Sequence, residues 1–364
     1  MKRGRLQKQN KTVDRNLLFL ILTFIVLGLI AVADASAPQS LNSYNDKFYL
    51  LKQQSISAFI GVVLLLTVSK INYKFWEKVA TPLFFVSIAL LIIVLIPGVG
   101  SKLLGARRWV SVGFINFQPS ELIKLAMAMY LAKVASVKKG AASFFIPIGV
   151  VLGLIMLQPD LGTAMIVAII GLSQIFISGI NMLYFMGGGI VGGILTFLLI
   201  ILSPYRKDRL LTYFEMTEDP LGKGYHIRQV LLGLGSGGLF GVGIGQSRQK
   251  YLFLPEASTD SIFSIILEEL GFLGGVVLIF MFLYFIFRGL RIVKNAPDDF
   301  SRVLALGIVA WLGGQAFLNM AAMTALLPLT GIPLPFFSYG GSSLVMVLVS
   351  CGILLNISKH TTYG

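Results

Sequence analysis

The chain has 364 residues, of which 56% are hydrophobic and only 13% are charged. A water-soluble domain cannot bury this much apolar surface, so the composition predicts an integral membrane protein. The net charge of +14 suits basic loops beside anionic lipid headgroups, and we see no long basic tract with interleaved aromatic residues that would indicate nucleic-acid binding. The single cysteine and two histidines argue against a disulfide framework, a thiolate metal site and histidine-based catalysis.

Apolar windows of about spanning length follow one another along the chain. They cover residues 16–34, 55–70, 80–98, 121–137, 144–158, 163–180, 183–203, 261–287, 302–323 and 342–357. The sequence therefore predicts an all-α, polytopic membrane protein of about ten transmembrane helices. Its basic start followed by an apolar stretch resembles a signal peptide, but the stretch is long enough to span, and we find no convincing small-residue cleavage site.

Lys and Arg in the short loops indicate the orientation, because positively charged loops stay on the cytoplasmic side. The N-terminal tail, residues 1–15, is rich in both, and parity places the basic loops near 70–78, 138–139 and 288–294 on the same side. We therefore expect both chain ends to be cytoplasmic, in a bacterial cytoplasmic membrane.

The predicted organisation is one transmembrane domain, residues 16–358, between the basic tail and a short cytoplasmic tail, residues 359–364. One long loop, about 204–260, falls outside the cell. This loop is still too short to bury much of a core and is rich in glycine, so we expect no soluble domain within it.

The informative polar motifs fall on the extracytoplasmic side, although only the basic loops were used to assign that side. They are GARRWVSVGFINFQPSELIK (105–124), LQPDLGTA (157–164), DPLGKGYHIRQ, GLGSGGLFGVGIGQSRQKYLFLPEASTD and LTGIPLPFFSYGGSS. This distribution predicts one extracytoplasmic site. GLGSGG matches a dinucleotide-binding pattern, but no strand precedes it. Its glycines more plausibly allow close backbone packing or form an anion nest.

Cationic residues in these motifs have two interpretations. Arg248 and Lys250 either extend to lipid headgroups, as such residues at membrane edges usually do, or bind a phosphate or pyrophosphate. Glu121 and Lys124 are three residues apart at a helix start, so they share a face and can pair. Trp109 is either an interfacial anchor or a platform for a sugar ring.

Carboxylates raise the same question. Asp160 is either the N-cap of the next helix or a site residue, and Asp260 is either a cap of the long apolar segment or a general base. Glu268 and Glu269 lie deeper, where ionisable groups are usually functional. Adjacent helical residues diverge by about 100°, so we expect that they cannot face one cavity and that one of them pairs with Arg, Lys or a backbone break.

LPEASTDSIF, together with QPSE, QPDLGTA, DPLGKGY, SGGLFGVGIGQSRQKY and PLPFFSYGGSS in the same order, resembles the SEDS family (shape, elongation, division and sporulation). This family includes FtsW, RodA and SpoVE, and the resemblance covers nearly the whole chain from about residue 16. The form LPEA and the ending GILLNISK are more similar to FtsW or SpoVE than to RodA.

The resemblance implies a peptidoglycan glycosyltransferase that polymerises lipid II, an undecaprenyl-pyrophosphate-linked disaccharide pentapeptide, at the outer membrane face. It assigns the essential aspartate to Asp260 and further functional positions to Trp109, Glu121 and Lys124. Ser338 of PLPFFSYGGSS and Asp160 of QPDLGTA are candidate substrate-binding residues on the same ground. The family usually has His and Phe around the aspartate, where this chain has Ser258 and Ser261.

The implied chemistry makes Asp260 the general base for the acceptor 4-hydroxyl, while Arg248 and Lys250 offset charge on the leaving pyrophosphate. A divalent cation, Mg²⁺ or Mn²⁺, is an open expectation, with Asp260 as a potential ligand and no organic cofactor. The expected partners are a class B penicillin-binding protein, other division or elongation proteins and membrane lipids. The alternatives are a flippase for lipid-linked precursors and a non-catalytic scaffold for a transpeptidase.

Overall fold

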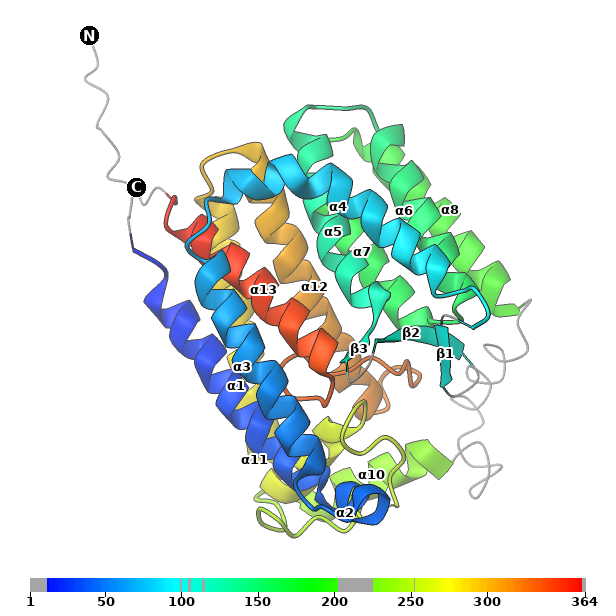
Figure 1. The fold of residues 1–364 in the computed structure, drawn as a ribbon, viewed down its shortest axis with the longest axis vertical. Helices are drawn as coiled ribbons and strands as arrows, with labels where there is room; N and C mark the ends of the chain where they lie inside the picture. Colours follow the sequence, from blue (N-terminus) through cyan, green and yellow to red (C-terminus); the bar gives the residue numbers. More distant parts are fainter. Residues whose placement is uncertain are drawn as a thin grey trace.

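The computed structural model describes residues 12–361 apart from 99, 104–105, 113–114, 202–224 and 252. Within these residues the chain crosses the bundle on α1 (Arg15–Ala35), α3 (Tyr49–Val68), α4 (Tyr73–Ile93), α5 (Pro119–Ser136), α6 (Ala142–Leu157), α7 (Leu161–Ile177), α8 (Met182–Ile201), α11 (Ile262–Lys294), α12 (Asp299–Met323) and α13 (Gly341–Ser358) (Figure 1). Each of them overlaps one predicted window, although α3 and α4 begin six and seven residues before theirs. Six are long and apolar enough to cross a membrane alone, so the prediction of a helical, multi-pass membrane protein is confirmed.

The bundle has two chemically different ends (Figure 1). We call one the site end; it carries α2 (Ala37–Tyr44), the strands and α10 (Tyr225–Gly237). The opposite end, which we call the basic end, carries the turns near residues 69–72, 137–141, 178–181 and 295–298, and both described chain ends lie there. Successive spanning helices thus run between the two ends, and the basic turns all lie at one end, as the predicted orientation of the spans requires.

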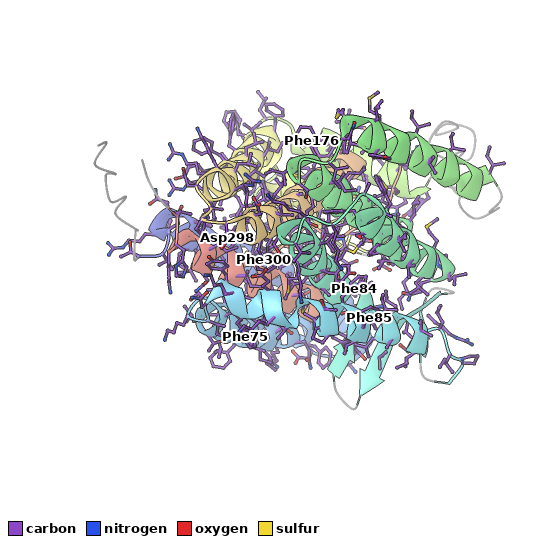
Figure 2. All side chains as sticks on the ribbon, turned by 90° about the horizontal axis from the view of Figure 1, so that it is seen from above. Phe75, Phe84, Phe85, Phe176, Asp298 and Phe300 are labelled. Atoms are coloured by element: carbon purple, nitrogen blue, oxygen red, sulfur yellow. The ribbon has the colours of Figure 1, made fainter. Side chains whose placement is uncertain are left out.

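Apolar side chains cover the outside of the bundle as well as its core (Figure 2). Phe75, Phe85 and Phe176 lie on the outer surface and are 47%, 59% and 66% exposed, whereas Phe84 and Phe300 lie inside and are 3% and 2% exposed. An apolar surface of this extent is expected where lipid tails, rather than water, surround the helices.

Helix α5 occupies the middle of the bundle, where it contacts α4, α6, α7, α12 and α13. Most of its residues are buried, among them the charged Glu121 and Lys124. Neighbouring helices shield these charges from lipid, so α5 does not need the uninterrupted apolar composition of a lipid-facing span.

A small antiparallel sheet precedes α5 at the site end, and the sequence did not predict it. Its strands are β1 (Gly100–Leu103), β2 (Ala106–Val112) and β3 (Ile115–Phe117), in the order β1-β2-β3. Ser101 pairs with Trp109, and Val110 pairs with Phe117. The strands are shorter than any hydrophobic window that predicts a span, and the polar pair Arg107 and Arg108 hides their apolar alternation.

Helix α11 is broken at Gly271, where φ is 67° and ψ is −169°. The loop after α10 fills the break: Val242 and Gly243 donate backbone hydrogen bonds to the carbonyls of Glu268 and Glu269. A Cβ atom on Gly241 or Gly271 would collide with the backbone of the opposite segment. The break therefore requires glycine on both sides. In the GLGSGG segment, Gly237 also packs against backbone of α11, which agrees with the close-packing interpretation.

An aromatic cluster holds the loop between α12 and α13 against the bundle. The ring of Phe24 stacks on Phe336 at 5.1 Å and on Phe282 of α11 at 4.7 Å. Gly28, one turn further along α1, lets the carbonyl of Phe336 approach. This packing brings residues 332–340 over the start of α11, where the candidate site lies.

Candidate active site

Asp260 lies in a series of turns, residues 253–261, just before α11. The helix begins at Ile262 with Ser261 as its N-cap, and the Ser261 side chain makes no capping hydrogen bond. Asp260 is half-buried. The capping interpretation of Asp260 is therefore wrong for this helix, and the general-base interpretation remains a proposal.

The backbone around Asp260 is hydrogen-bonded to three other parts of the chain. Asn319 of α12 donates to the Asp260 carbonyl at 2.8 Å and to the Ile332 carbonyl at 2.7 Å. The Ser338 hydroxyl donates to the Thr259 carbonyl at 2.6 Å. The Ser258 hydroxyl reaches α2 by donating to the side chain of Gln39 at 2.9 Å. These contacts fix where Asp260 sits, as a site needs when it must hold a reacting group in place.

Ser338 has a second role in this arrangement, because its oxygen also accepts from the backbone N–H of Leu334 at 2.7 Å. Its own carbonyl accepts from Gln54 of α3, and Tyr339 donates its backbone N–H to Ser258. Ser338 thus joins the loop between α12 and α13 to the Asp260 turns. Its hydroxyl is occupied by these contacts, so any contribution to substrate binding acts through the backbone it holds.

A histidine lies beside the aspartate although the sequence motif lacks one. The Nε2 atom of His226, on α10, is 2.8 Å from the hydroxyl oxygen of Ser261. That hydroxyl donates its only hydrogen to the Pro255 carbonyl at 3.0 Å. A serine hydroxyl carries one hydrogen, so with that hydrogen on Pro255 the imidazole donates through Nε2, and with the other tautomer the hydroxyl donates to Nε2 instead.

Glu121 and Lys124 pair as the sequence predicts, at 2.7 Å, and both are about 2% exposed. Lys124 also donates to the side chain of Gln315 on α12 at 3.2 Å and lies 4.9 Å from the ring centroid of Trp311. The Trp311 indole donates to the same oxygen of Gln315. The pair is therefore one part of a buried polar cluster between α5 and α12.

Helix α12 connects this cluster to Asp260. Gln315 and Asn319 are one turn apart and share a face. Gln315 donates to the Pro333 carbonyl at 2.9 Å, and Asn319 donates to the adjacent Ile332 carbonyl and to Asp260. A continuous set of hydrogen bonds thus runs from α5, across α12 and the following loop, to the turn that carries the aspartate.

Glu268 and Glu269 face the turn formed by residues 245–250. Glu268 accepts from the Ser247 hydroxyl and from the backbone N–H of Arg248, the latter at 3.0 Å. Glu269 accepts from the Ser247 backbone N–H at 3.1 Å. Ser247 lies between the two carboxylates, so both reach one turn despite their divergence along the helix. The expectation that one of the pair meets Lys is confirmed, since Glu269 pairs with Lys250.

Lys250 is buried between two carboxylates. Its ammonium nitrogen is 2.7 Å from Asp34 of α1 and 2.8 Å from Glu269. Burial alone would lower the pKa of Lys250, but its hydrogen bonds to Asp34 and Glu269 outweigh burial and hold this pKa above the ordinary lysine value. Lys250 therefore joins α1, the turn and α11. Arg248, two residues earlier, is exposed and is the better placed of the two to meet a ligand.

The remaining candidates lie around the sheet. Trp109 is half-buried on β2. Asp160 is the N-cap of α7 and accepts from the Thr163 backbone N–H at 3.0 Å, so its capping interpretation is confirmed. Arg108 lies 3.9 Å from Asp160 and donates to the Gln158 and Pro159 carbonyls. Arg108 thereby fastens the turn between α6 and α7 to the sheet. DPLGKGY, apart from its last residue, lies outside the described residues.

The side chains that could act as metal ligands also bear on the expectation of a divalent cation. Among the residues that the structure describes, no group of three or more His, Cys, Asp or Glu side chains could hold an ion. Mg²⁺ commonly keeps several waters and binds through one or two carboxylates plus substrate phosphates. A cation that arrived with a pyrophosphate would fit Asp260 as a single carboxylate ligand, but the described residues do not form a resident site.

Sequence reasoning missed several members of the site: Gln39, His226, Trp311, Gln315 and Asn319. Each lies on a helix, where one polar or aromatic residue taken by itself does not indicate a site. The uncharged amides in α12, at a spacing of four, were the available signal for a polar face inside an apolar helix.

The fold is a multi-pass helical bundle, so the chain is a membrane protein. Its candidate site residues, which include carboxylates, amides and an exposed arginine, lie toward one end of the bundle. The model of one family, described as a cell cycle protein and named for FtsW, RodA and SpoVE, matches residues 14–363. The chain belongs to this family.

Similar proteins cover nearly the whole chain. Stage V sporulation protein E of Bacillus subtilis is 42% identical over 363 residues, which cover 97% of this chain and 99% of that protein. A probable peptidoglycan glycosyltransferase FtsW of Trichlorobacter lovleyi is 40% identical over 353 residues, covering 95% of this chain and 93% of that one.

Solved structures confirm the fold. A chain from a structure described as "Structural coordination of polymerization and crosslinking by a peptidoglycan synthase complex" superposes with a TM-score of 0.78 at 29% identity, over 95% of this chain and 97% of that one. The rod shape determining protein RodA of Thermus thermophilus gives a TM-score of 0.71 at 28% identity, over 97% and 98% of the two chains.

Proposed function

We propose that the chain is a peptidoglycan glycosyltransferase that polymerises lipid II at the outer face of the bacterial cytoplasmic membrane. The observation that carries this proposal is the placement of Asp260, half-buried at the site end and held by backbone hydrogen bonds from α12 and the loop that follows it. Relatives named peptidoglycan glycosyltransferase and a structural neighbour from a peptidoglycan synthase complex support the reaction class.

In the proposed reaction, Asp260 takes the proton of the acceptor sugar's 4-hydroxyl as that oxygen attacks the anomeric carbon of the donor. The bond between this carbon and the pyrophosphate breaks, and undecaprenyl pyrophosphate leaves with the bonding electron pair. Arg248, exposed on a turn that both Glu268 and Glu269 hold, offsets the charge on the departing group. Trp109 would stack on sugar, while Glu121, Lys124, Asp160 and Ser338 hold the elements around the substrate.

Asp260 would be the carboxylate that holds a divalent cation bound to the pyrophosphate, and such a cation would offset the charge on the leaving group. No step above depends on it. The partner we propose is a class B penicillin-binding protein, which cross-links the strands that this chain makes. A partner of that kind agrees with the structural neighbour, which belongs to a synthase complex of polymerisation and crosslinking.

The orientation of the site follows from the basic end. That end carries Lys138 and Lys139 in a turn, Lys74 in the first turn of α4 and Lys294 at the end of α11, so we place it in the cytoplasm and the site end outside. A reporter at Asn42 should then be reachable from outside intact cells, and one at Asn295 should not. Protection of the Asn42 reporter would refute the proposed face.

Polymerisation of labelled lipid II by the purified chain, alone and with its transpeptidase, tests the activity. Asp260→Asn should lose roughly 10²–10⁴-fold in rate while remaining folded. Glu256→Gln removes an exposed carboxylate from the same turns and should stay active. A folded Asp260→Asn protein that still makes long strands would end the assignment. Transfer of lipid II across vesicles without polymer would instead indicate a flippase.

A further inference from the structure

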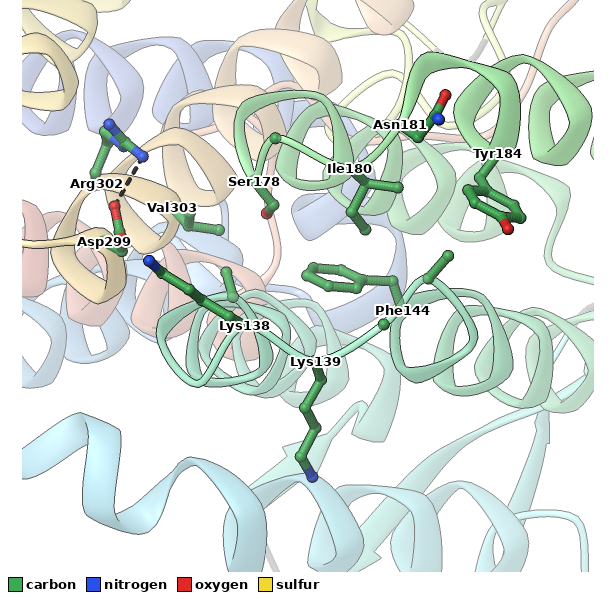
Figure 3. Close-up of a pocket in the computed structure, with 14 residues that line it drawn as sticks. Lys138, Lys139, Phe144, Ser178, Ile180, Asn181, Tyr184, Asp299, Arg302 and Val303 are labelled. Carbon is green, nitrogen blue, oxygen red and sulfur yellow. Dashed lines mark hydrogen bonds and ion pairs between the residues drawn. The ribbon is translucent and has the colours of Figure 1, made fainter.

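A cavity of about 370 Å³ opens at the basic end, across the bundle from Asp260. It lies between the turn from α5 to α6, the turn from α7 to α8 and the first turn of α12 (Figure 3). Its volume falls within the range of about 300–1,000 Å³ typical of small-molecule pockets. The proposed glycosyltransfer does not use it.

The lining of this cavity is cationic on one side and apolar on the other. Lys138 and Arg302 lie on the charged side with Asp299, and in Figure 3 the Lys138 ammonium points toward the pair that Asp299 forms with Arg302, whereas Lys139 points away. Phe144, which is 1% exposed, and Ile180 belong to the apolar part of the lining (Figure 3). A ligand with an anionic group attached to an apolar body matches this division.

Arg302 retains an unused donor. One terminal nitrogen of its guanidinium pairs with Asp299 at 2.8 Å, but its Nε is buried and has no hydrogen-bond partner among the described residues. Buried donors of folded proteins are nearly always paired, so such a donor indicates a missing acceptor. Guanidinium groups bind phosphate oxygens with parallel hydrogen bonds, and the Arg302 side chain is 43% exposed, so a phosphate in the cavity can reach its accessible nitrogens.

The start of α6 also favours an anion. Ala141, which lines the cavity, is the N-cap of α6 and offers no side-chain cap, although the Ser143 and Phe144 amides already donate to the Gly140 and Ala141 carbonyls. The amides and the dipole at a helix N-terminus attract negative charge. Two cationic side chains and the start of α6 therefore border one cavity.

We propose that this cavity binds the phosphate of an anionic membrane lipid, with Arg302 and Lys138 on the phosphate and Phe144 against the glycerol and upper chain. Basic pockets between transmembrane helices on the cytoplasmic side are suited to such headgroups. Free phosphate shares the anionic chemistry but would leave the apolar side of the cavity unfilled, so the lipid is the better match.

The test is thermal unfolding of the purified full-length chain in detergent while phosphatidylglycerol, phosphatidylcholine or inorganic phosphate is added. Phosphatidylglycerol should stabilise the protein with saturation, and the other two should not. Arg302→Gln should weaken this effect about tenfold or more, the usual worth of a charged hydrogen bond. Lys138→Gln should act in the same direction and serves if Arg302→Gln does not fold.

Two matched controls make the result specific. Lys139→Gln changes a residue of the lining whose side chain points away from the other charged residues in Figure 3, and Lys70→Gln changes an exposed cation at the same end outside the lining. Both should respond to phosphatidylglycerol as the wild type does. Equal weakening in Lys70→Gln and Arg302→Gln would overturn the proposal in favour of diffuse surface charge. Equal stabilisation by phosphatidylcholine, or saturation by inorganic phosphate alone, would overturn the anionic lipid as the ligand.

Discussion

Asn319 holds Asp260 in place, because its side-chain amide nitrogen donates to the Asp260 carbonyl at 2.8 Å. The same nitrogen donates to Ile332 at 2.7 Å, so both of its hydrogens are used. One buried side chain on α12 therefore sets the distance between the aspartate turn and the loop that covers it. The residue acts on the reaction through position, since no atom of Asn319 has to touch substrate.

Asn319→Ala should both destabilise the protein and slow polymerisation. Two buried carbonyls would lose their partner, which costs about 1–3 kcal/mol each where no water can replace it. The rate of lipid II polymerisation per folded molecule should fall as well, because Asp260 would no longer be fixed. Measuring unfolding and initial rate on the same preparation separates the two effects.

Asn356→Ala is the matched control. Asn356 is also a buried asparagine that joins two segments, donating to Ser69 at 2.9 Å and accepting from Tyr73 at 2.8 Å, but it lies at the basic end. Its loss should cost similar stability and leave the rate per folded molecule unchanged. Equal rates in the two variants would remove the positioning role from Asn319.

The sequence predicts the contacts of this site between residues that are close in the chain, and it does not predict those between residues that are far apart in the chain. The Glu121–Lys124 pair follows from a spacing of three on one helix, and the ten spans follow from local apolar windows. Asn319 reaches a residue 59 positions away, and no local pattern specifies that distance. Sequence alone also treats Arg248 and Lys250 as equivalent, because Asp34 and Glu269, which pair with Lys250, are 216 and 19 positions away from it.

Arg248 and Lys250 should now behave differently when they are replaced. Arg248 is exposed, so Arg248→Ala should leave stability within about 0.5 kcal/mol. It should slow polymerisation roughly tenfold to a hundredfold if it makes one charged hydrogen bond to pyrophosphate. Lys250→Met leaves Asp34 and Glu269 buried without their cation and should cost about 3–5 kcal/mol of stability.

Neutralising the whole cluster distinguishes a structural lysine from a catalytic one. Lys250→Met combined with Asp34→Asn and Glu269→Gln removes the unpaired charges and should recover much of the lost stability. If this triple variant folds and polymerises, Lys250 acts by holding the turn. If it folds well but is inactive while Arg248→Ala is fully active, the two assignments must be exchanged.

Exchange of Glu121 and Lys124 should be more harmful than removal of both charges. The exchange would bring a carboxylate to the position where Lys124 donates to the Gln315 oxygen and faces the Trp311 ring. Both neighbours repel an anion. The double variant Glu121→Gln with Lys124→Met keeps the approximate volumes and should remain folded. Thermal unfolding of the two proteins checks the order, and an exchanged protein of wild-type stability would contradict it.

The hydrogen bond between His226 and Ser261 provides an imidazole beside Asp260, where the family resemblance implies His and Phe and the chain has Ser258 and Ser261. Nε2 of His226 is 2.8 Å from the Ser261 hydroxyl, and we expect the tautomer in which Nε2–H donates and the hydroxyl donates to Pro255. His226→Ala should therefore loosen the turn and slow polymerisation about two- to tenfold, the range expected for one neutral hydrogen bond. His226→Gln retains an N–H donor and should restore most of the rate, whereas a role that requires imidazole chemistry would leave Gln as slow as Ala.

A double-mutant cycle completes the test of this contact. Ser261→Ala loses this hydrogen bond and the one to Pro255, so it should be at least as slow as His226→Ala, and the double variant should be no slower than Ser261→Ala. The rate constant of lipid II polymerisation is the measurement, with unfolding as the control for misfolding. Additive losses would show that His226 and Ser261 act separately, and the imidazole would then have to influence Asp260 by another route than the Ser261 hydroxyl.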